Sequence, residues 1–319
     1  MTSEARHLQQ NAHAPGTRAN RSSNLQTYFT AADSLDFDPL RPSEQDILNF
    51  LALLARSPRG YTNITAHLAS IDYYCQSHGS TFPLRGSFRV RNMLRALKRS
   101  VKPPRRYKIP ISPRQLRAML RYFARWSFAP MLCFAVSLTL LAMLRQSNIA
   151  PPSRYKFSEL HQLCFGDVLV NRKGTHLLVR LKWSKTRQND EMSIIRIPRL
   201  DNSPFCPVRL FEQYKQSLGF TPGKTAPLLM IRDNHDRLQV VSTAFLTKYL
   251  KTAAAAIVLP VKDISLHSLR RTGAIIARAN GVDVSDIKHM GTWSSDAIHC
   301  YLSACAHMFI PTQQAWKNV

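Results

Sequence analysis

The sequence predicts a mainly α-helical protein with one small antiparallel β-sheet (α+β), divided into two domains. Three observations support this prediction. Apolar residues recur every three or four positions over most of the chain, which is the spacing of amphipathic helices. Alternation of apolar and polar residues, typical of strands, appears between residues 164 and 200. A stretch rich in proline and basic residues separates two helical regions, near residue 105.

The first domain is expected to be helical and to occupy residues 23–100, after a disordered polar tail of residues 1–22. Ser43 is expected to cap a helix, because Asp46 follows at the spacing of a capping box. Another helix, FRVRNMLRALKRS, should end before Pro103. The helix between these two is expected to bury one stripe of side chains: Ile64, Leu68, Ile71 and Cys75.

The predicted linker, residues 101–111, is stiff and positively charged. From Arg85 to Lys108 the chain has ten basic residues and no acidic one. Such a block is more typical of a binding surface than of a solvated face. The basic residues expected to contact an anionic partner are Arg89, Arg91, Arg95, Lys98, Arg99, Lys102, Arg105 and Arg106.

The second domain is expected to span residues 112–319. Its first helix has Ser112 as a cap and Pro113 at the first helical position. An apolar helix over residues 131–144 follows. The antiparallel sheet is predicted from three runs, which are CFGDVLV, HLLVRLKW and MSIIRIPRL. The other predicted helices are PVRLFEQYKQSLG, STAFLTKYLKTAAAAI, SLHSLRRTGAIIARANG, VSDIKHMG and SSDAIHCYLSAC.

The composition favours a polyanionic partner. The chain has 44 Lys and Arg against 19 Asp and Glu, a net charge of +25. Each cation placed on a phosphate releases condensed counterions, so this charge favours nucleic acid, although RNA, ribosomes or an anionic membrane surface would also attract it. The apolar run of residues 131–144 is too short to cross a bilayer, so we expect no membrane segment.

The sequence also gives no sign of a metal or nucleotide cofactor. The six cysteines form no CxxC pair, and neither paired carboxylates for two metals nor a GxxxxGK[ST] loop is found. The amino terminus lacks the apolar core of a signal peptide. We therefore expect an intracellular protein without a cofactor, located in the nucleus if its source is eukaryotic.

The segment HSLRR is the strongest local signal for chemistry. His267 and Arg270 are three residues apart, so they share one face of a predicted helix. A guanidinium fork beside an imidazole is suited to bind a phosphate. The alternative is an ordinary polar surface helix, and the motif alone does not decide between the two.

Four blocks in order make the pattern specific. They are LLAMLRQSNIAPPS with Arg145, LKWSKTRQNDEMSIIRIP with Lys185, HSLRR, and GTWSSDAIHCYL with Tyr301. Together they resemble the tyrosine recombinase/integrase superfamily over about residues 25–315. Four segments are similar in sequence to recombinases of eukaryotic mobile elements, the Crypton and Ngaro-like group: LRQSNIAPPS, WSKTRQ, FCPVRLFEQY and GTWSSDA.

The resemblance implies a two-domain DNA clamp, with a helical core-binding domain and a catalytic domain. Tyr301 would be the nucleophile, Arg145 and Arg270 would bind the phosphate, and His267 would assist. Lys185 would protonate the leaving oxygen, although Lys182 and Arg187 lie close to it in the sequence. The implied partner is double-stranded DNA bound by a homo-tetramer on two sites, with no small-molecule substrate.

One position departs from the family pattern. The family usually places His or Trp directly after the glycine of the last block, where this chain has Thr292, and Trp293 follows one residue later. Either Trp293 supplies the remaining phosphate contact or that role is vacant. For Arg145 the structural alternative is a cation at the end of an apolar helix. Three other functions stay open: an inactive DNA-binding protein of the same fold, a relaxing topoisomerase, and an unrelated RNA-binding protein.

Overall fold

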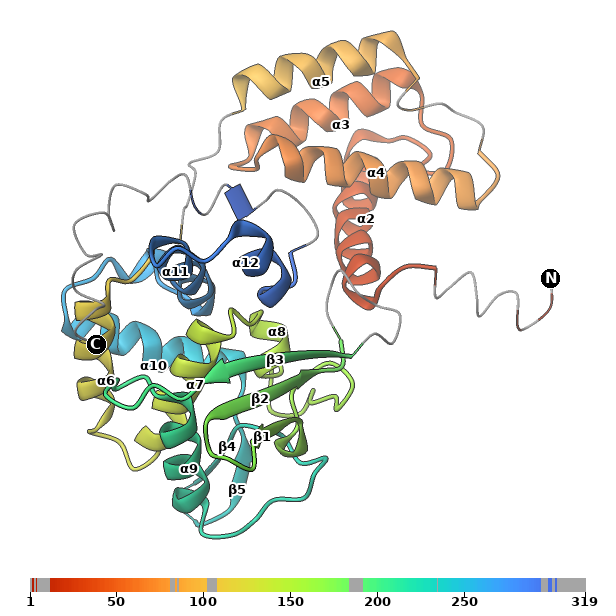
Figure 1. Ribbon diagram of the computed structural model, residues 1–319. Helices are drawn as coiled ribbons and strands as arrows, with labels where there is room; N and C mark the ends of the chain where they lie inside the picture. The colour runs from red at the N-terminus through yellow and green to blue at the C-terminus, as the bar shows by residue number, and fades with distance from the viewer. Residues whose placement is uncertain are drawn as a thin grey trace. The chain divides into compact units, whose positions relative to one another are not determined.

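The chain divides into two compact units, Met1–Arg106 and Tyr107–Val319 (Figure 1). The computed structural model describes residues 2, 4, 12–80, 84, 86–101, 108–183, 192–233, 235–293, 298, 299 and 302. Over these residues both units are mainly helical, and the strands form two small antiparallel sheets in the second unit. The predicted fold class is therefore confirmed.

The first unit is helical, and its caps agree with the sequence. Its helices are α2 (Pro15–Leu35), α3 (Glu44–Arg56), α4 (Tyr61–Ser77) and α5 (Phe88–Ser100). The predicted capping box is confirmed, because Asp46 N–H donates to Ser43 Oγ at 3.2 Å and Ser43 N–H donates to the Asp46 carboxylate at 2.8 Å. All four residues of the predicted α4 stripe are buried: Ile64, Leu68, Ile71 and Cys75.

Helix α2 corrects the prediction of a disordered tail over residues 1–22, which is wrong for residues 15–22. The helix begins at Pro15 and is anchored further along, where Tyr28 is fully buried and donates to the Pro39 carbonyl at 3.1 Å. Once a helix has formed, each further residue adds one hydrogen bond at little cost. The polar first turns are therefore helical although they bury little apolar surface.

The second unit combines helices with the predicted sheet. Its helices are α6 (Pro113–Phe123), α7 (Ala129–Leu141), α8 (Gln146–Ile149), α9 (Pro207–Leu218), α10 (Thr243–Ala256), α11 (Leu266–Ala279) and α12 (Val284–Met290), with 3-10 turns η1 (Phe165–Asp167) and η2 (Val261–Asp263). Its strands are β1 (Val168–Val170), β2 (His176–Leu181), β3 (Ser193–Pro198), β4 (Met230–Arg232) and β5 (Leu238–Val240).

The sheet β1–β2–β3 is antiparallel, with Val168 opposite Val179 and Arg180 opposite Ile194. It confirms the predicted sheet. The hairpin β4–β5 was not predicted.

Helix α7 is the centre of the second core. It packs against α9 and α11, and the Phe134 ring stacks on Tyr214 with centroids 5.7 Å apart. Contacts on several sides explain why its sequence is apolar all round. Within the part of the chain that the structure describes, none of the helices combines the length and the hydropathy needed to cross a bilayer.

The crossing of α7 and α11 depends on a glycine. A Cβ atom placed on Gly273 would lie 2.0 Å from the Leu140 carbonyl oxygen. That contact is with backbone, which cannot turn aside as a side chain can. We expect Gly273→Ala to lower the free energy of unfolding by about 3 kcal/mol, the upper end of the usual range for overpacking.

Urea unfolding would measure this change. Gly223→Ala is the matched control, because no atom lies within 4 Å of the position its Cβ would take. Equal stability of the two variants would contradict the close approach of α11 to α7.

Candidate active site

Arg145 lies in a sharp turn after α7. The helix ends at Leu141, Met143 has a left-handed φ of 49°, and Arg145 is the residue before α8. The apolar helix therefore ends before the predicted residue 144, and Arg145 is not in its last turn. A favourable charge at the end of α7 does not explain this arginine.

The side chain of Arg145 is bound to Thr292. One guanidinium nitrogen donates to the Thr292 hydroxyl at 2.5 Å, and another donates to the Thr292 carbonyl oxygen at 2.8 Å. Thr292 is buried, so these bonds form with little competition from water.

Arg270 is held by the same turn. The side chain is 3% exposed and donates to the carbonyl oxygens of Met143 and Gly291, the latter at 2.6 Å. The guanidinium carbon also lies 3.8 Å from the centroid of the Trp293 ring, which is within the range of a cation–π contact. The 291–293 turn thus contacts both arginines that the sequence singled out.

The backbone of this turn is constrained. Thr292 has a φ of 54°, which is unusual for a β-branched residue. A Cβ atom on Gly291 would lie 1.7 Å from the Trp293 ring, so only glycine lets the indole lie against the backbone there.

The residues on either side of Tyr301 belong to the same region. Ile298 is fully buried in a small apolar cluster with Met143, Ala274 and Ile287, and Leu302 packs against that cluster. Tyr301 itself lies outside the described residues, as does most of the helix predicted over residues 294–305.

His267 lies one turn before Arg270 on α11, as predicted. Its pKa is lowered, chiefly by partial burial of the ring and then by the positive charges of Arg270, Arg271 and Lys108. Part of the His267 side chain is exposed to solvent. Arg271 has a different place, since it is buried and donates to the Lys108 carbonyl at 2.9 Å.

Lys182 is the alternative lysine of the hairpin, and it is paired. Its ammonium group lies 2.8 Å from the Asp167 carboxylate and 3.3 Å from Cys164 Sγ. Burial acts in the opposite direction, but the bonds to these two groups raise the pKa of Lys182. A raised pKa makes it a poorer proton donor. Lys185 and Arg187 lie outside the described residues.

Asn148 is a residue that the sequence analysis missed. It follows Arg145 in α8, is buried, and donates from Nδ2 to the Trp183 carbonyl at 2.8 Å. The bond joins the Arg145 segment to the point where the chain leaves β2 toward Lys185. The sequence alone gives no signal for this role, because the burial of Asn148 and its partner appear only in the structure.

On the first unit, α5 carries an exposed basic face. Arg91, Arg95, Lys98 and Arg99, here termed the α5 basic stripe, recur at helical spacing and are exposed. Arg89 points elsewhere, because it donates to Glu44 at 3.1 Å and to Gln45 at 3.0 Å. Lys102, Arg105 and Arg106 lie outside the described residues.

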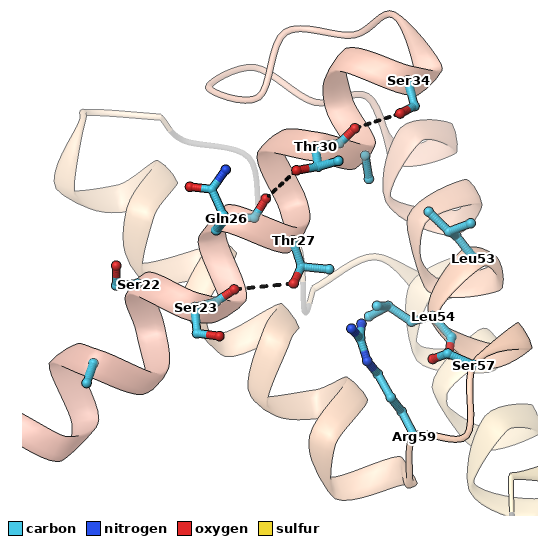
Figure 2. A pocket seen from close by; sticks show the side chains of 12 residues that line it. Ser22, Ser23, Gln26, Thr27, Thr30, Ser34, Leu53, Leu54, Ser57 and Arg59 are labelled. Atoms are coloured by element: carbon cyan, nitrogen blue, oxygen red, sulfur yellow. Dashed lines mark hydrogen bonds between the residues drawn. The ribbon is translucent and has the colours of Figure 1, made fainter. Parts of the chain in front are cut away.

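A groove of about 940 Å³ lies between α2 and α3 (Figure 2). Its α2 wall is rich in hydroxyl groups, and Thr27, Thr30 and Ser34 each donate to the carbonyl four residues earlier. The groove contains none of the predicted catalytic residues. No group of three metal-ligating side chains occurs among the described residues.

Comparison with known proteins identifies the fold. No family model and no curated protein matches the chain. A lambda integrase dimer bound to a COC′ core site is 15% identical, covers 93% of this chain and 92% of its own, and has a TM-score of 0.59. Tn1549 transposon integrase in complex with transposon right end DNA is 15% identical, covers 95% of this chain and 96% of its own, and has a TM-score of 0.58. XerH site-specific recombinase bound to difH substrate is 12% identical, covers 92% of this chain and 79% of its own, and also has a TM-score of 0.58.

The chain has the tyrosine recombinase fold. The narrower resemblance to recombinases of eukaryotic mobile elements stays a prediction. In the sequence, Thr292, and not His or Trp, follows Gly291, with Trp293 one residue later. The two residues divide the contacts, since Thr292 binds Arg145 and Trp293 covers Arg270.

The electrostatics of this recombinase fold make a testable prediction for His267. We expect it to titrate below the ordinary histidine value of about 6.5, and so to be neutral at pH 7. The pKa of His267 is lower in the folded state than in the unfolded state. The stability linked to this group is therefore present above a pH of about 6.5 and is lost as the pH falls through the pKa of the folded state.

NMR titration of the His267 ring would measure the midpoint. Lys108→Gln should raise it, because one of the neighbouring positive charges is removed. Lys173→Gln, at an exposed position between β1 and β2, is the control and should leave it unchanged. A wild-type midpoint at or above 6.5 would contradict the assignment.

Proposed function

We propose that this protein is a site-specific DNA recombinase, which cuts and rejoins duplex DNA through a 3′-phosphotyrosyl intermediate on Tyr301. One observation carries the proposal. Arg145 and Arg270 are far apart in the sequence, yet one turn contacts both guanidinium groups. Ile298 and Leu302, on either side of Tyr301, belong to or pack against the apolar cluster that contains Met143, and Met143 accepts a hydrogen bond from Arg270.

The reaction needs no metal if cations of the protein stabilise the phosphate. The Tyr301 oxygen would attack the scissile phosphorus and lose its proton, while the bond from phosphorus to the 5′ oxygen breaks. Arg145 and Arg270 would bind the non-bridging oxygens and offset the charge that grows in the pentavalent transition state. The phosphotyrosyl bond keeps the energy of the phosphodiester, so resealing needs no nucleotide.

Lys185 and His267 would move the protons. Lys185 would donate one to the leaving 5′ oxygen, and the ion pair of Lys182 with Asp167 supports Lys185 over its neighbour. The lowered pKa of His267 leaves its ring neutral near pH 7, so the ring can accept a proton or donate a hydrogen bond to the phosphate. The Asn148 bond to Trp183 would help to hold the segment that leads to Lys185.

Duplex binding would involve both domains. The α5 basic stripe would contact phosphates from the core-binding domain, residues 23–100, and residues 101–111 would link it to the catalytic domain, residues 112–319. Strand exchange between two duplexes requires four cuts, so we propose a homo-tetramer on two DNA sites. An inactive DNA-binding protein of the same fold is the alternative.

The nucleophile can be tested without knowing the target sequence. Wild-type protein would be incubated with a pool of nicked duplexes containing a randomised segment, and detergent-stable protein–DNA adducts would be recovered and sequenced. We expect adducts that enrich one sequence, and none with Tyr301→Phe, which removes only the attacking oxygen. Tyr155→Phe is the matched control, because Tyr155 is 80% exposed and outside the site. Duplex binding without any adduct would favour the inactive alternative.

The α5 basic stripe can be tested through the salt dependence of binding. Arg95→Gln and Arg99→Gln should each reduce the slope of log K against log salt by about 1, because one phosphate contact is lost. Fluorescence anisotropy of an arbitrary duplex would measure the slope. Arg56→Gln on α3 removes the same charge and is expected to leave the slope unchanged. An equal slope in all variants would exclude the stripe.

A further inference from the structure

Arg145 binds two oxygen atoms of one residue. Its two nitrogens reach the hydroxyl and the carbonyl oxygen of Thr292 at 2.5 Å and 2.8 Å. A guanidinium fork matches a pair of neighbouring oxygens, and a phosphate offers such a pair with full negative charge. In the structure, Thr292 therefore occupies donors that a phosphate would need.

Thr292 holds this place in an unfavourable conformation. Its φ of 54° lies in the left-handed region, where a β-branched side chain is crowded by its own backbone. Strain of this kind persists only where other contacts impose it, and it occurs most often at functional sites. The contacts that hold Thr292 here include the two bonds to Arg145 and the packing of Trp293 on Gly291 and Arg270.

We infer that Thr292 is an internal substitute for the scissile phosphate, which keeps Arg145 occupied until DNA displaces it. The inference rests on the proposed function and adds a means of regulating the same site. A phosphate would replace the two neutral oxygens of Thr292 with charged oxygens as the acceptors of Arg145. Once released from Arg145, Thr292 could leave its unfavourable backbone conformation. Both changes favour the exchange.

The exchange at Arg145 would also affect Arg270, because the residue after Thr292 contacts it. Thr292 is followed by Trp293, which covers Arg270, and then by Ile298, which packs in the cluster of Met143 and Ala274. A change at Thr292 would therefore also change the contact of Trp293 with Arg270. In this way, DNA binding at Arg145 would be coupled to Arg270, the second phosphate-binding arginine of the proposed site.

A simpler role for Thr292 gives the opposite result. If Thr292 only orients Arg145 and stays bound during the reaction, removing its hydroxyl would weaken phosphate binding. If Thr292 competes with phosphate, the same change would strengthen it. The sign of the effect separates these roles, and a residue that merely supports the fold would not produce tighter binding.

The experiment uses the full-length protein with inorganic phosphate as the probe. Calorimetric titration at low ionic strength would compare the wild type with Thr292→Val, which keeps the branched shape and removes the hydroxyl. We expect about tenfold tighter phosphate binding in Thr292→Val, because one hydrogen bond to a charged group no longer competes. Thr292→Ser keeps the hydroxyl and should bind like the wild type.

Two controls define the site. Arg145→Ala should lose this binding phase, which distinguishes it from phosphate held elsewhere on a chain of net charge +25. Thr252→Val removes an exposed hydroxyl on α10 that donates to the Lys248 carbonyl, and it should leave the affinity unchanged. Weaker or equal binding by Thr292→Val would overturn the inference.

A second measurement covers the case in which Thr292→Val does not fold. Wild-type protein labelled with 5-fluorotryptophan, with the Trp293 signal assigned from Trp293→Phe, should show a fluorine shift at Trp293 as phosphate binds; an unchanged signal would also overturn the inference. Failure of the proposed function looks different, because the pool of nicked duplexes would then yield no adduct. Adducts together with weaker phosphate binding by Thr292→Val would reject the internal substitute alone.

Discussion

The bonds from Arg270 to two carbonyl oxygens are the interaction on which the rest of the site depends. A guanidinium that is 3% exposed has lost most of its hydration, so its donors must be satisfied within the protein. Met143 and Gly291 supply acceptors from separate parts of the chain, and Trp293 covers the flat face. Arg270 thereby joins the turn before α8 to the turn after α12, and it brings Thr292 within reach of Arg145.

Helix packing prepares this junction. Gly273 lies one turn after Arg270 on α11, and its lack of a side chain lets the helix approach the Leu140 carbonyl near the end of α7. Residues three apart on a helix share a face, so the close approach at Gly273 directs Arg270 toward Met143 just beyond α7. The stability of the second core and the geometry of the candidate site therefore depend on the same contact between helices.

Local patterns in the sequence were enough to predict most elements, whereas the partners of the site residues were not predictable. The caps at Ser43 and Ser112 depend on neighbours three residues away, and both were predicted. Helix α2 was missed because its polar composition outweighed the helical spacing of Leu25, Tyr28 and Phe29. The carbonyl oxygens that hold Arg270 come from residues distant in sequence, and a backbone acceptor leaves no trace in residue type.

The electrostatics of the site explain why it suits an anion. Arg145 donates to the carbonyl oxygen of Thr292, Arg270 donates to that of Gly291, and the Trp293 ring lies against Arg270. Burial and the positive charges of Arg270, Arg271 and Lys108 lower the pKa of His267, so this end of α11 is electrostatically positive. If the proposed function holds, a phosphodiester would place its negative charge beside Arg145 and Arg270, and the same positive charges that lower the pKa of His267 would favour its binding.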